Sequence, residues 1–133
     1  MKKIEHIGIA VSNLDEADQL YTNLLGSKPY KRESVKTEGV ITSFFKTNNL
    51  KVELIQGIGP NNPISKFINK KGEGLHHIAF AVKDIYVEIK RLKKLGFNII
   101  NEEPKKGADN KLICFIHPKS TKHVLIELCQ EIK

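Results

Sequence analysis

Two similar apolar segments of the chain each carry a histidine, and this repetition indicates shared chemistry. His6 lies in EHIGIAV at residues 5–11, and His77 lies in GLHHIAFAV at residues 74–82. Because alternate side chains of a strand point to opposite faces, each segment has large apolar residues on one face. The other face carries one imidazole followed by two small residues, which leaves room for a ligand.

Two glutamates occupy matching places in two further apolar segments. Glu53 lies in VELI at residues 52–55, and Glu127 lies in IELC at residues 126–129. A carboxylate in an apolar strand is costly unless it is paired or coordinates a metal. Imidazole nitrogen and carboxylate oxygen together suit a borderline divalent ion such as Zn, Mn, Co, Ni or Fe.

The elements that must position these residues occur in the same order twice: strand, helix, three strands. Ser12, with Asp15 three residues later, predicts the start of the first helix and Gly26 its end, while Asp84 and Gly96 bound the second. The patterns predict strands at residues 4–11, 30–35, 39–45, 50–55, 77–82, 97–100, 112–116 and 124–129.

A duplication of this kind predicts geometry as well as element order. Two halves related by a pseudo-two-fold axis would bring together His6, Glu53, His77 and Glu127. We therefore predict one α+β domain over residues 1–133. Its first module covers about residues 4–55, its second about residues 75–130, and residues 56–74 connect them around a short helix at residues 64–70.

The remaining histidines are weaker candidates for ligands. His76 falls on the same face as Ile78 and Phe80, so we expect it to pack at the start of its strand. His117 precedes Pro118 in a turn, and His123 lies in the same loop, where a surface position is expected.

Composition and charge narrow the class of protein. The chain has 133 residues, of which 40% are hydrophobic and 28% charged, and this is typical of a soluble globular domain. No apolar run reaches the roughly 18 residues of a membrane span, and we expect a cytoplasmic protein without a membrane partner. The net charge of +7 allows an anionic partner but does not identify one, and the dispersed lysines lack the interleaved aromatics of a nucleic-acid surface. Cys114 and Cys129 lie in apolar runs, which predicts buried reduced thiols.

The chain resembles the vicinal oxygen chelate, or glyoxalase-like, superfamily, and within it the methylmalonyl-CoA epimerase family. The resemblance rests on residues 4–11, 52–55, 72–80 and 115–128. It implies a fold of two βαβββ modules that form a curved mixed sheet around a central metal site, and usually a homodimer. It places metal ligands at His6, His77 and Glu127, with Glu53 at a fourth metal-facing position, and implies one divalent ion, Co, Zn, Mn or Ni.

The implied reaction interconverts the two C2 epimers of methylmalonyl-CoA, an acyl-CoA substrate. Inverting that carbon requires a proton acceptor on one face and a proton donor on the other. The pseudo-two-fold relation predicts Glu53 and Glu127 on opposite sides, so we assign these two as catalytic. Some members carry a glutamate base where this chain has Thr42, which cannot act as that base.

Other functions fit parts of the pattern. A glyoxalase-I-like isomerase uses a similar set of His and Glu ligands, and an extradiol dioxygenase uses two His and one carboxylate, usually in a longer chain. A metal-free antibiotic-binding protein has the same fold but lacks the ligand residues. A purely structural domain would have to satisfy two strand carboxylates in another way.

Overall fold

The computed structural model describes residues 3–133, and contacts divide these into two compact units. One unit holds residues 7–76, and the other holds residues 3–6 together with residues 77–133. The strand β1 (Lys3–Ala10) passes the division after His6, and β5 (Gly74–Ala81) passes it after His76.

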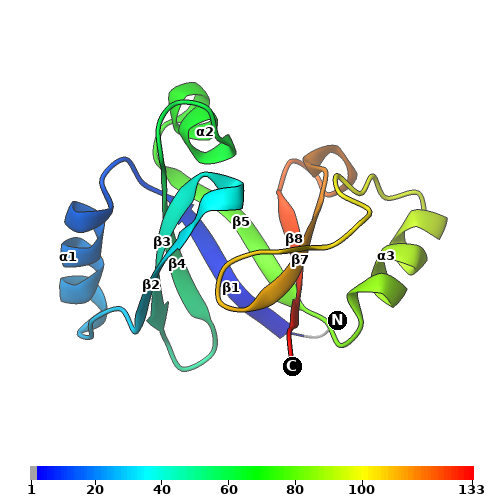
Figure 1. The fold of residues 1–133 in the computed structure, drawn as a ribbon, viewed down its shortest axis with the longest axis horizontal. Helices are drawn as coiled ribbons and strands as arrows, with labels where there is room; N and C mark the ends of the chain where they lie inside the picture. Colours follow the sequence, from blue (N-terminus) through cyan, green and yellow to red (C-terminus); the bar gives the residue numbers. More distant parts are fainter. Residues whose placement is uncertain (1–2) are drawn as a thin grey trace. The chain divides into compact units, whose positions relative to one another are not determined.

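The unit of residues 7–76 is built on an antiparallel sheet. Its strands β2 (Lys31–Val35), β3 (Val40–Lys46) and β4 (Lys51–Gly57) pair in that order. A 3-10 turn at Lys36–Glu38 joins β2 to β3. The helix α1 (Leu14–Leu25) packs on β3 and β4, and α2 (Pro63–Lys71) packs on β4 (Figure 1). Leu14, Phe45 and Leu54 are buried where α1 meets the sheet.

The start of α1 differs from the prediction by one residue. The N-cap is Asn13, whose side-chain oxygen accepts a hydrogen bond from the Glu16 backbone N–H at 3.1 Å. Ser12 was expected in this role, but its backbone N–H donates to the Glu73 carboxylate at 2.8 Å. The C-cap is Gly26 as predicted, with a φ of 75° that favours glycine.

The other unit contains a mixed sheet. Its strand β5 pairs in parallel with β8 (Ile126–Glu131), β8 pairs antiparallel with β7 (Lys111–Ile116), and β7 pairs antiparallel with β6 (Lys105–Lys106). The helix α3 (Ile85–Lys94) begins at Asp84, whose carboxylate accepts from two backbone N–H groups, as the sequence predicted. A 3-10 turn at Pro118–Ser120 follows β7.

One predicted strand of this unit, at residues 97–100, is wrong. In the structure only Ile99 forms a bridge there, to Ile116. The Asn101 side-chain oxygen accepts from the Phe115 backbone N–H at 2.9 Å, where a neighbouring strand would offer a carbonyl. The Asn98 backbone N–H likewise bonds the Ser120 hydroxyl at 2.9 Å. Backbone pairing with β7 is thus limited to a single bridge around Ile99, and β6 pairs further along β7, at Leu112 and Ile113.

The two faces of this sheet have different roles. The helix α3 lies beside β7 and β8 (Figure 1). Toward α3, the sheet buries Cys114, Ile116 and Leu128 against Ile85 and Ile89. On the opposite face, Cys129 packs with Ala79 and Ile113.

Both cysteines are buried and reduced, as predicted. Burial, with a smaller contribution from the Glu127 carboxylate, raises the pKa of the Cys114 thiol to about 12. Among residues 3–133, no helix is long and apolar enough to cross a bilayer.

Removing the Leu128 side chain tests the face toward α3. Leu128 is fully buried, so Leu128→Ala should lower the free energy of unfolding by about 2–5 kcal/mol, measured by urea denaturation. The matched control Leu95→Ala removes the same atoms from a residue that is 64% exposed and should cost less than about 0.5 kcal/mol. Equal losses in the two variants would contradict this packing.

Candidate metal centre

Three buried side chains of one unit converge: His6, His77 and Glu127. The Nε2 atoms of the two imidazoles lie 3.1 Å apart. One carboxylate oxygen of Glu127 lies 3.3 Å from His77 Nε2, and the other lies 3.6 Å from His6 Nε2. The three residues are 5%, 4% and 5% exposed, respectively. The arrangement therefore gathers two nitrogens and a carboxylate away from bulk water.

The parallel pairing of β5 with β8 sets this arrangement. The register places Ala79 opposite Glu127, and His77 lies two residues before Ala79 on the same face of β5. The antiparallel neighbour β7 places Phe115 opposite Glu127. The Phe115 ring meets the His77 imidazole edge to face, with centroids 5.9 Å apart. The apolar ring thus forms one wall of the cluster.

The cluster fits a divalent cation by distance and by donor chemistry. Ligand atoms about 2.0–2.2 Å from a common ion lie roughly 3 Å from one another, close to the separations observed here. Two imidazole nitrogens and a carboxylate oxygen are donors that Zn, Co, Mn and Ni accept. A buried carboxylate also gains most from a positive partner.

The fourth predicted residue, Glu53, belongs to the unit of residues 7–76. It is buried in β4, 6% exposed, and its Cα pairs with Phe44 on β3. Its assigned roles as fourth ligand and catalytic group stay predictions. In the same unit, the Thr42 hydroxyl is buried and without a hydrogen-bond partner among the described residues.

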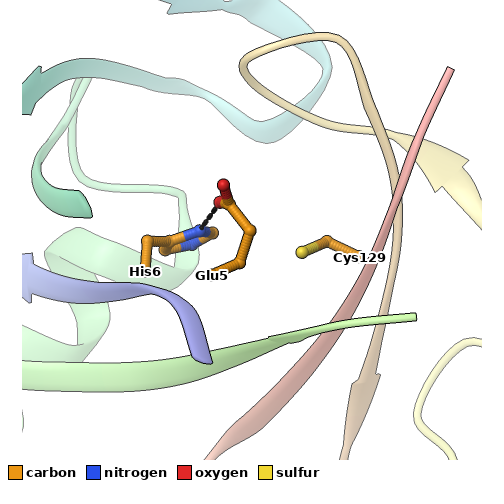
Figure 2. Close-up of side chains that lie close together, drawn as sticks. All are labelled: Glu5, His6 and Cys129. Carbon is orange, nitrogen blue, oxygen red and sulfur yellow. Dashed lines mark hydrogen bonds and ion pairs between the residues drawn. The ribbon is translucent and has the colours of Figure 1, made fainter. Parts of the chain in front are cut away.

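Glu5 is a residue of this site that the sequence reasoning missed. Its carboxylate Oε1 lies 2.8 Å from His6 Nδ1. Figure 2 shows this bond, with the Cys129 thiol pointing toward the pair. Neighbours along a strand normally point to opposite faces, so a contact between residues 5 and 6 is not expected from period two. A carboxylate directly before a candidate histidine ligand was the available signal.

The other histidines lie where the sequence placed them. The His76 ring packs edge to face on Phe67 of α2, with centroids 4.9 Å apart. His117 is exposed, and its Nδ1 accepts from the Lys119 backbone N–H at 3.1 Å. His123 is also exposed.

Comparison with known proteins identifies the class to which this fold and cluster belong. The family model of the Glyoxalase/Bleomycin resistance protein/Dioxygenase superfamily matches residues 5–115. The chain therefore belongs to this superfamily, and the predicted family and fold class are confirmed.

Individual relatives narrow the resemblance to epimerases. The mitochondrial methylmalonyl-CoA epimerase of Dictyostelium discoideum is 39% identical over 95% of this chain and 76% of its own. The ethylmalonyl-CoA/methylmalonyl-CoA epimerase of Cereibacter sphaeroides is 36% identical over 96% and 97% of the two chains. A variant of Streptomyces coelicolor methylmalonyl-CoA epimerase, solved in complex with 2-nitronate-propionyl-CoA, has a TM-score of 0.94 at 30% identity, covering 97% and 94% of the two chains. These matches bear out the prediction of an enzyme of the epimerase class.

Substitution of adjacent histidines tests which face of β5 holds the metal. His77→Ala removes a nitrogen of the buried cluster, so the protein should retain no stoichiometric Co²⁺ after dialysis, measured by elemental analysis. His76→Ala is the matched control and should retain the ion, because His76 packs on Phe67 instead. The opposite pattern would mean that the wrong face has been assigned to the site.

Proposed function

We propose that the protein interconverts the two C2 epimers of methylmalonyl-CoA, with one divalent cation held by His6, His77 and Glu127. The observation that carries this proposal is the buried two-imidazole, one-carboxylate cluster. Its support is the similarity to methylmalonyl-CoA epimerases over nearly the whole chain.

The reaction sets demands that these residues can meet. The C2 proton lies between a thioester and a carboxylate, and it must leave from one face of the carbon and return to the other. A bound cation would stabilise the negative charge that develops on the thioester oxygen by about several kcal/mol. The protein must then supply a proton acceptor and a proton donor.

We assign these proton transfers to Glu127 and Glu53. One carboxylate takes the C2 proton, and the protonated partner delivers a proton to the opposite face, so that the carbon inverts and the charges balance. Both carboxylates are buried, so each could hold the transferred proton away from bulk water. Glu127 would serve as ligand and proton carrier together.

Charge supports an acyl-CoA as the substrate. The formal net charge of +7 favours an anionic ligand, and the CoA phosphates supply such charge. The proposal also includes three predictions: the ion is Co, Zn, Mn or Ni, the protein is a homodimer, and it is located in the cytoplasm. A comparison of the epimerisation rates of ethylmalonyl-CoA and methylmalonyl-CoA would establish which acyl groups the protein accepts.

Isotope exchange tests the proposed reaction directly. Protein loaded with Co²⁺ and incubated with methylmalonyl-CoA in heavy water should replace the C2 proton with deuterium, followed by proton NMR. Glu127→Gln should slow this exchange at least about 100-fold, because it removes a proton carrier and a ligand oxygen. The control Glu131→Gln alters an exposed carboxylate of the same strand and should exchange normally. Exchange no faster than without protein would refute the epimerase proposal.

Glu53→Gln separates the two faces of the reaction. If Glu53 serves only one face, this variant should slow conversion between epimers about 100-fold and still exchange the C2 proton of one epimer. The measurement pairs deuterium uptake with a chiral assay of each epimer. Wild-type conversion in Glu53→Gln would remove Glu53 from the catalytic pair.

A further inference from the structure

The His6 imidazole is held at both of its ring nitrogens. Nδ1 lies 2.8 Å from a carboxylate oxygen of Glu5, while Nε2 faces His77 Nε2 at 3.1 Å and Glu127 at 3.6 Å. The Glu5 side chain is only 11% exposed, and that of His6 is 6% exposed. The ring therefore lies between a carboxylate behind it and the candidate metal centre in front of it.

We propose that Glu5 is a positioning residue for the cation, acting through His6. An ionised carboxylate can only accept hydrogen bonds, so its contact at 2.8 Å requires the proton of a neutral His6 on Nδ1. Nε2 then carries the free electron pair, directed at His77 and Glu127. This inference rests on the proposed cation site and adds a residue that prepares a ligand without touching the ion.

The hydrogen bond does more than select the tautomer. A carboxylate that accepts from one ring nitrogen makes the other nitrogen a stronger electron donor, and it fixes the orientation of the ring. Such partners of ligating histidines are typically worth about 10–100-fold in metal affinity. Burial keeps this pair from being weakened by water, as an exposed ion pair would be.

Cys129 defines the competing interpretation of Glu5. Ligand atoms of Glu5, His6 and Cys129 all lie within 4.8 Å of one another, so these residues could form a separate donor set for a thiophilic ion (Figure 2). The Cys129 thiol, however, donates to the Phe80 carbonyl at 3.6 Å, and Glu5 is bonded to His6. We infer that Glu5 serves His6, with Cys129 as an apolar neighbour.

Two measurements on the full chain test this role. In metal-free wild-type protein, the nitrogen-15 NMR shifts of His6 should show the proton on Nδ1, and Glu5→Ala should shift the population toward Nε2. Competition of Co²⁺ with a chromophoric chelator should show about 10–100-fold weaker binding in Glu5→Ala. Glu5→Gln keeps an acceptor oxygen, so it should preserve the tautomer and lose less affinity. Glu131→Ala, the control for loss of an acidic residue, should bind like the wild type.

The possible results separate this inference from the function on which it rests. If wild-type protein binds no divalent ion, the proposed cation site fails. If Glu5→Ala binds Co²⁺ as the wild type does, with the tautomer unchanged, only the role of Glu5 fails. A sulfur-to-cobalt charge-transfer band that disappears in Cys129→Ser would overturn the inference in favour of the thiol-containing set. Should Glu5→Ala not fold, the wild-type tautomer and the Glu5→Gln variant still decide the question.

Discussion

The burial of the Glu127 carboxylate between two imidazoles is the constraint on which the candidate site depends. Burying a carboxylate costs several kcal/mol of lost solvation, and hydrogen bonds or a positive charge must offset this cost. Neutral imidazoles supply only part of this offset. A divalent ion among the same three side chains would supply the rest, and this supports the proposed cation site.

The sheet of residues 77–133 has one face that packs in the apolar core and another that carries the candidate ligands. Period two sends Leu128 into the apolar layer under α3, while Glu127 points to the other face. The parallel pairing of β5 with β8 then sets how far His77 lies from Glu127 along the strands. A one-residue shift of this register would turn the carboxylate into the apolar layer, so the packing of α3 also protects the site.

The internal repeat of the sequence predicted which strand residues would lie together in the candidate site. The convergence of His6, His77 and Glu127 could be predicted because each stands at a repeated place in a strand pattern, and period two puts each on the face opposite its large apolar neighbours. Glu5 could not be found this way, because its contact with His6 depends on a side chain bending toward its own neighbour. Local hydrogen bonds likewise decided the two errors in the fold. Asn13 rather than Ser12 caps the first helix, and the side chains of Asn101 and Ser120 accept backbone hydrogen bonds where a strand was predicted.

The departure from the epimerase pattern that bears on proton transfer is Thr42, where the resemblance implies a glutamate base in some members. This makes the identity of the second proton carrier the most informative feature of the chemistry, and it concentrates the proposal on Glu53. The cation site is the foundation for all of these assignments. Its most direct test is anomalous diffraction at the cobalt edge from crystals of the Co²⁺-loaded protein. The account predicts one strong anomalous peak about 2.0–2.2 Å from the Nε2 atoms of His6 and His77 and from a Glu127 oxygen. A fully loaded crystal with its peak elsewhere, and none at these three residues, would contradict it.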